Sequence, residues 1–91
     1  MDPKQYLEEL LLLTAQQGAT DLHISPGHYP VIRVDGRLVM LTNYSVLDSE
    51  TTQGLVFTLL GEEKKNRFLS EKELDFSFEV PGKNRFRVNA Y

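Results

Sequence analysis

The chain has 91 residues, with 10 basic and 13 acidic side chains, a net charge of −3 and no cysteine. A chain of this length folds as one domain, residues 1–91, and the absence of cysteine excludes disulfides and thiolate metal sites. The acidic balance disfavours nucleic-acid binding. The longest aliphatic run, Leu10 to Leu13, is far too short to span a bilayer, and a chain without cysteine fits a reducing compartment, so we expect a cytoplasmic protein.

The first expected helix runs from about Pro3 to Gln17. Asp2 before a proline is a typical N-cap, and Gly18 is typical of a helix C-terminus. Leucines form one face of this helix, but Leu12 and Leu13 widen the apolar stripe beyond what one sheet would cover. We therefore expect part of the helix to contact something outside the domain.

Three strands are expected next. Thr20 to Ser25 alternates apolar and polar residues, which predicts a short strand with one polar face. Val31 to Val34 and Arg37 to Leu41 flank Asp35-Gly36, a dipeptide that favours a type I′ hairpin because both turn residues need positive φ. In such a hairpin Val34 lies opposite Arg37.

Two helices are expected after the hairpin. Asp48 precedes a stretch with helical spacing of apolar residues, which predicts an N-cap, and Gly61 predicts the end of that helix. Glu62 to about Leu69 then indicates a short charged helix, which Phe68 and Leu69 anchor to the core.

The last two strands form a hairpin whose apolar residues must share one face. That requirement gives the loop an odd length. A three-residue loop at 81–83 places Glu79 opposite Arg85 and Ser77 opposite Arg87, whereas a five-residue loop pairs Glu79 with Arg87. The order of elements indicates an α+β fold, an antiparallel sheet with helices mainly on one side.

Basic residues are concentrated at the end of the chain. From Pro81 onward there are three basic residues and no acid, whereas the rest carries seven basic and thirteen acidic residues. Two interpretations follow for Arg85 and Arg87. Either they bind an anion, or they pair across strands with Glu79 and Asp75 in exposed ion pairs worth about 0 to 1 kcal/mol.

The residues predict no catalytic or metal site. Asp21, His23 and His28 could be metal ligands, but a Pro-Gly turn interrupts them and nothing downstream completes a first shell. A Ser/His/Asp constellation and a Gly-x-x-x-x-Gly-Lys-Ser/Thr loop are both missing from the sequence. We therefore expect no enzyme activity and no bound cofactor for this chain alone.

Four sequence blocks resemble the N-terminal domain of PilT-like type IV pilus retraction ATPases, in the type II/IV secretion ATPase superfamily. They are Gly18 to Ser25, Pro30 to Leu38, Leu74 to Phe78 and Arg85 to Asn89. The resemblance extends over nearly the whole chain and implies a PAS-like domain. It also implies a following P-loop ATPase domain, which these residues do not contain, so we expect a fragment of a longer protein.

The resemblance further implies a function. Such ATPases form cytoplasmic homohexamers, peripheral to the inner membrane through the pilus machinery, that use ATP and Mg to power pilus retraction and twitching motility. The N-terminal domain is expected to pack on the ATPase domain of a neighbouring subunit as a regulatory and coupling domain. Arg85 and Arg87 match the family's arginines in this strand and are expected to contact nucleotide phosphates in the ring.

Two alternatives stay open. One is a free-standing PAS-like module that binds a ligand or a protein. The other is the same domain from a pilus-assembly or type II secretion ATPase. The inner-membrane platform of the pilus is a further expected partner of the retraction ATPase.

Overall fold

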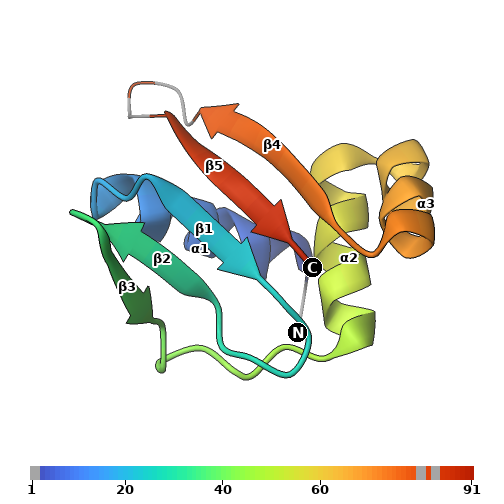
Figure 1. The fold of residues 1–91 in the computed structure, drawn as a ribbon, viewed down its shortest axis with the longest axis horizontal. Helices are drawn as coiled ribbons and strands as arrows, with labels where there is room; N and C mark the ends of the chain where they lie inside the picture. The colour runs from blue at the N-terminus through green and yellow to red at the C-terminus, as the bar shows by residue number, and fades with distance from the viewer. Residues whose placement is uncertain (1–2, 80–81, 83–84) are drawn as a thin grey trace.

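The structure, a computed structural model, describes residues 3–79, 82 and 85–91 (Figure 1). Within them, three helices and five strands occur. The helices are α1 (Pro3–Gln16), α2 (Ser49–Leu60) and α3 (Glu62–Glu71). The strands are β1 (Asp21–Ile24), β2 (Val31–Val34), β3 (Arg37–Met40), β4 (Leu74–Glu79) and β5 (Arg85–Ala90).

All five strands form one sheet in the order β3-β2-β1-β5-β4. The expected α+β class is confirmed, with one difference in strand direction: the sheet is mixed, because β1 and β5 run parallel while the other neighbours are antiparallel. A parallel pair needs a long crossover connection. Here the chain between β1 and β5 includes the β2–β3 hairpin, α2, α3 and β4 (Figure 1).

The predicted β2–β3 hairpin is confirmed. Asp35 and Gly36 both have positive φ, 51° and 79°. Val34 lies opposite Arg37, as a two-residue turn requires.

The β4–β5 hairpin has the register of a three-residue loop. Glu79 lies opposite Arg85 and Ser77 opposite Arg87. The expected loop at 81–83 and the expected N-cap Asp2 fall outside the described residues, apart from Gly82. Phe78 packs beside Phe86, with ring centroids 5.9 Å apart, on the shared apolar face.

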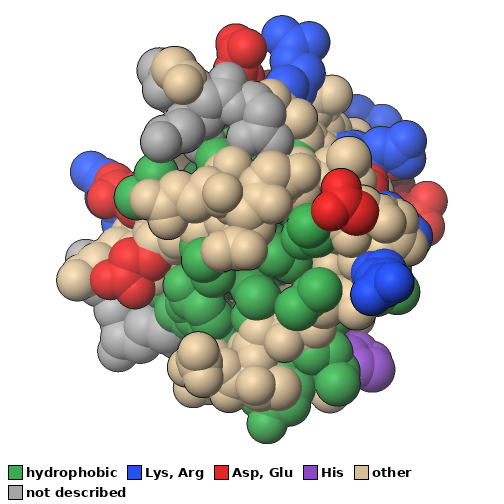
Figure 2. Space-filling view, turned by 90° about the vertical axis from the view of Figure 1, so that its left-hand side faces the viewer, with side chains coloured by type: hydrophobic (Ala, Val, Ile, Leu, Met, Phe, Trp, Pro, Cys, Tyr) green, Lys and Arg blue, Asp and Glu red, His purple; other side chains and the backbone are tan. Residues whose placement is uncertain are grey.

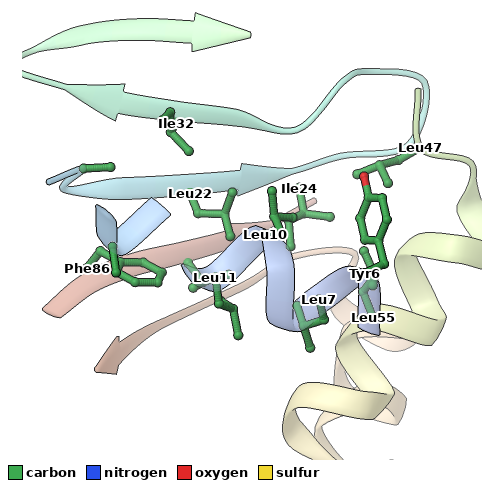
Figure 3. Close-up of a cluster of buried hydrophobic side chains, with 13 residues drawn as sticks. Tyr6, Leu7, Leu10, Leu11, Leu22, Ile24, Ile32, Leu47, Leu55 and Phe86 are labelled. Atoms are coloured by element: carbon green, nitrogen blue, oxygen red, sulfur yellow. The ribbon is translucent and has the colours of Figure 1, made fainter. Parts of the chain in front are cut away.

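One face of the sheet is buried by the helices. The side chains of α1 point toward β1 and β2, with Leu10, Leu22 and Ile32 close to fully buried (Figure 3). A second cluster joins α2 and α3 to the β4–β5 end of the sheet. Its members are Val56, Phe68, Leu74 and Ala90. Burial of this apolar surface is the main stabilising term of the fold.

The predicted ends of α2 and the predicted glycine after α1 are observed, whereas α3 runs to Glu71, two residues beyond the expected Leu69. The Asp48 carboxylate accepts a 2.6 Å hydrogen bond from the Thr51 N–H, and Gly61 ends α2 with φ 89°. Gly18 follows α1 with φ 67°. Leu12 is 42% exposed, as its place outside the core stripe of α1 predicts. None of the described helices combines the length and the apolar character that crossing a bilayer requires.

Candidate functional site

The face of the sheet opposite the helices, which we call the open face, carries the candidate site. Because neighbouring residues of a strand point to opposite faces, the residues that alternate with the buried ones lie on it. On β1 these are Asp21 and His23, and on β5 they are Arg85, Arg87 and Asn89, of which Asn89 is itself buried. The two arginines named from the sequence therefore lie on the same face.

Arg87 lies between two strands of this face. The register places it beside Ser77 of β4 and beside Asp21 of β1. Its Nε lies 3.8 Å from Oδ1 of Asp75, and the two side chains are 56% and 59% exposed. An ion pair so long and so exposed contributes little to stability. The guanidinium group is therefore held by the strand but open to an anionic partner.

Arg85 lies nearer the β4–β5 loop and is exposed. It lies opposite Glu79, yet within the described residues it has no ion pair shorter than 4 Å. The ion pairing expected from the sequence is therefore present between Arg87 and Asp75. Within the described residues it is not present between Arg85 and Glu79.

A second ion pair extends the charged row toward β2. Nε of Arg33 lies 3.6 Å from Oδ2 of Asp21, and the same oxygen accepts a 2.8 Å hydrogen bond from Oγ1 of Thr20. Arg33 also donates from Nη1 to the carbonyl of Gly36 at 3.3 Å. Across β2, β1 and β5 the charges thus alternate in the order Arg33, Asp21, Arg87.

Sequence reasoning missed the part of Asp21 and Arg33 in this row. The polar side of β1 was visible as an alternating pattern, but its neighbour on the sheet was not. Only the parallel pairing of β1 with β5 brings Asp21 beside Arg87. That pairing joins residues far apart in the chain, and no local pattern specifies it.

His23 and Tyr91 meet at the other end of the open face. Their rings stack with centroids 6.2 Å apart and an interplanar angle of 12°, and the Tyr91 hydroxyl lies 3.4 Å from Nδ1 of His23. Nε2 of His23 is buried without a hydrogen-bond partner in the described part of the chain. Among the described residues, no three His, Cys, Asp or Glu side chains gather closely enough to hold a metal ion.

A cleft of about 340 Å³ lies beside the carboxyl end of β5. It is lined by Arg67, Glu71, Glu73, Leu74, Asp75, Asn89, Ala90 and Tyr91. Arg67 and Glu71 pair with each other at 3.1 Å along α3. The lining is largely polar and open to solvent, in contrast to the apolar pockets that usually enclose small ligands.

The sequence is similar to that of a known ATPase. The type IV pilus retraction ATPase PilT of Pseudomonas aeruginosa is 45% identical over 85 residues, which is 93% of this chain and 24% of the relative. The chain therefore spans about a quarter of the length of this curated relative. No family model matches the chain.

Two solved structures have a similar fold. A crystal structure of the pilus retraction motor PilT with bound ADP matches with a TM-score of 0.65 and 33% identity, over 89% of this chain and 24% of that one. The ATPase DotB of Legionella pneumophila matches with a TM-score of 0.68 and 25% identity, over 92% of this chain and 24% of that one. The mixed five-stranded sheet is thus a fold that ATPases of this kind contain.

Proposed function

We propose that the chain is the regulatory and coupling domain of a hexameric motor that retracts type IV pili, because its sequence and its fold are similar to those of the N-terminal domain of PilT-like secretion ATPases. The observation that carries the proposal is the 45% identity to PilT over 93% of the chain. The motor would work in the cytoplasm, peripheral to the inner membrane, with the pilus platform as its partner, and would support twitching motility.

In this proposal, a P-loop domain outside these residues would bind ATP and Mg and supply the energy for pilus retraction. The similar PilT structure holds ADP, which supports nucleotide binding by the longer protein. The 91-residue domain itself would neither hydrolyse ATP nor bind it tightly. It would pack on the ATPase domain of a neighbouring subunit, so that closure around ATP moves this domain as a rigid body.

The open face would supply the link to the nucleotide. Arg87 projects from the middle of β5 with more than half of its side chain exposed, and its ion-pair partner Asp75 lies 3.8 Å away. A guanidinium group on a fixed strand stabilises charge that develops on a transferring phosphoryl group. We assign this role to Arg87 first and to Arg85 second, because Arg85 lies nearer the hairpin loop.

Deletion of residues 1–91 from the full-length ATPase tests the proposal. We expect slower ATP turnover and a loss of twitching, with pili that stay extended. A deletion strain that twitches like the wild type would overturn it. If the deletion instead left cells without pili, the domain would belong to a pilus-assembly ATPase.

The match to DotB favours a second candidate, the same domain in a secretion ATPase outside the retraction branch. Its TM-score of 0.68 is close to that of PilT, but its identity is lower, 25% against 33%. We therefore rank retraction first. Loss of secretion with normal pili in the deletion strain would reverse this ranking.

A further inference from the structure

The sheet ends on one side in a bare apolar strand. Leu38, Val39 and Met40 of β3 are 60%, 43% and 62% exposed, and we call these three residues the β3 edge. No strand of the described chain lies beyond them. Figure 2 views the molecule from the side on which β3 lies in Figure 1, and hydrophobic side chains gather in the middle of that view. Exposed apolar edges of this kind are sites of pairing with another chain.

The backbone of the β3 edge has free hydrogen-bonding groups at alternate residues. Leu41 donates its N–H to the carbonyl of Pro30 at 2.9 Å, which marks that pair as hydrogen-bonded. Hydrogen-bonded and non-hydrogen-bonded pairs alternate along an antiparallel ladder. Val39 therefore bonds toward β2, whereas Leu38 and Met40 direct their N–H and C=O groups away from the sheet.

We propose that the β3 edge is an interaction surface for a second copy of this chain, which pairs through its own β3 in antiparallel orientation. Centring the pairing on Val39 places Leu38 of each copy opposite Met40 of the other. Each of these pairs then exchanges both backbone hydrogen bonds, so every outward group of Leu38 and Met40 is satisfied. The free backbone groups of the β3 edge therefore match those of a second copy in this register.

The side chains fit the same register on both faces of the sheet. Leu38 and Met40 lie on the open face, so apolar contacts form there between the two copies. Val39 lies on the helix-covered face, opposite Ile32 of its own chain, and meets Val39 of the other copy. Cross-strand apolar pairs of this kind stabilise a sheet.

Charge does not oppose the pairing. The nearest ionised group on the strand, Arg37, lies opposite Leu41 of the second copy. The two Arg37 residues are therefore four positions apart, about 13 Å along the strand, beyond the Debye length of about 8 to 10 Å. The other edge of the sheet differs, since a β4–β4 pairing centred on Ser77 would set Asp75 against Glu79.

A cysteine cross-linking experiment tests the register. The 91-residue chain has no native cysteine, so a single Val39→Cys substitution gives one thiol per copy. In the proposed dimer the two thiols face each other across a non-hydrogen-bonded pair, with Cβ atoms about 4.5 to 5.5 Å apart, close to the distance that a disulfide needs. We expect rapid formation of a covalent dimer under mild oxidation. The matched control is Leu12→Cys on α1, because Leu12 and Val39 are 42% and 43% exposed.

Equilibrium sedimentation supplies the second measurement. We expect the unmodified chain to shift from monomer to dimer as its concentration rises. Val39→Lys, which sets two ammonium groups face to face, should raise the dissociation constant about tenfold or more. Circular dichroism confirms that the variant folds. A chain that stays monomeric at the highest concentration, or Leu12→Cys that cross-links as fast as Val39→Cys, would overturn the proposal.

Discussion

The two edge strands of the sheet, β4 and β3, differ in charge and in how far the helices cover them. The β4 edge carries Asp75 and Glu79 on the open face, and on its other face Leu74 packs with Phe68 of α3. The β3 edge carries three exposed apolar residues, and none of α1, α2 or α3 contacts β3 extensively. Charged and covered edges resist pairing with another chain, and bare apolar edges favour it.

This difference separates two kinds of binding on one sheet, of which we call β4 and β5 one half and β2 and β3 the other. Charged side chains cross the open face from Arg33 on β2 to Arg87, which projects from a strand paired on both sides. Apolar contact is available only at the β3 edge among the strands that the structure describes. A change in one half is therefore expected to leave the binding function of the other half intact, and the following predictions test that separation.

The largest expected effect belongs to Arg87. Under the proposed function, Arg87→Gln in the longer protein should lower ATP turnover by about 10³-fold or more, because a phosphate-stabilising arginine contributes on that scale. The stability of the 91-residue chain should change little, since the ion pair with Asp75 is long and exposed. Steady-state ATP hydrolysis and urea unfolding measure the two quantities.

Arg33→Gln is the matched control for Arg87→Gln. Arg33 lies on the same face and forms an ion pair of similar length, 3.6 Å, with Asp21, but it lies on the β2 side of the sheet. We expect its loss to leave turnover within a few-fold of the wild type. If Arg33→Gln and Arg87→Gln lowered turnover equally, general disturbance of the open face would explain the effect. Normal turnover of both Arg85→Gln and Arg87→Gln would leave β5 with a structural role alone.

The next largest effect concerns the core between the two halves. Leu22 on β1 is fully buried, and Leu22→Ala should lower the free energy of unfolding by about 2 to 5 kcal/mol. Leu38→Ala on the β3 edge should change it by about 0.5 kcal/mol or less, because Leu38 is 60% exposed. Denaturant unfolding of dilute, monomeric chain measures both. A cost for Leu38→Ala near that of Leu22→Ala would mean that β3 is part of the core.

Local residues predicted much of this fold. Asp35-Gly36 predicted the β2–β3 hairpin because its turn needs positive φ at both residues. In the β4–β5 hairpin, the requirement that Phe76 and Phe78 share a face with the apolar residues of β5 left two possible registers. Asp48 and Gly61 set the bounds of α2. In each case the deciding interaction lies within a few residues of the signal in the sequence.

Non-local pairings could not be predicted in the same way. The parallel pairing of β1 with β5 depends on how α2, α3 and the hairpins between these strands pack. The row of ion pairs from Arg33 to Arg87 could therefore be seen only in the structure. The β3 edge was also hidden, because alternation within the hairpin does not tell which strand lies at the end of the sheet. The sequence did locate Arg85 and Arg87 on one face, but their proposed contact with nucleotide stays a prediction.

A smaller effect is expected at the N-cap of α2, the helix that packs on the β4–β5 half. The Thr51 N–H lowers the pKa of Asp48 below its ordinary value of 3.8 by hydrogen bonding to the carboxylate. A lowered folded pKa adds stability above pH 3.8, and this contribution is lost as the pH falls through the folded value. Asp48→Asn keeps an acceptor without the charge and should lose this pH dependence.

Asp48→Ala separates the two halves directly. It removes the acceptor at every pH, so backbone amides in the first turns of α2 should exchange faster with deuterated solvent. Amides of the β2–β3 hairpin should keep their exchange rates. Equal acceleration in both places would show that the two halves of the domain open together.

The smallest effect is expected at Tyr6, which links α1 to the loop after β3. Its ring packs edge-on against Tyr44, with centroids 5.3 Å apart, and its hydroxyl is buried without a partner in the described part of the chain. Tyr6→Phe keeps the ring contact and removes an unsatisfied polar group, so at neutral pH stability should be unchanged or higher by up to about 1 kcal/mol.

The alkaline pH dependence distinguishes this prediction from a simple packing effect. Burial, with a smaller contribution from Tyr44, raises the pKa of Tyr6 from 10.0 to about 12. The folded state then holds a proton that the unfolded state releases, so the wild type loses stability as the pH rises from 10 to 12. Tyr6→Phe should lose less over this range and keep only the share due to Tyr44, whose pKa burial also raises. Unfolding curves that fall equally with pH in both proteins would show that the Tyr6 hydroxyl reaches water.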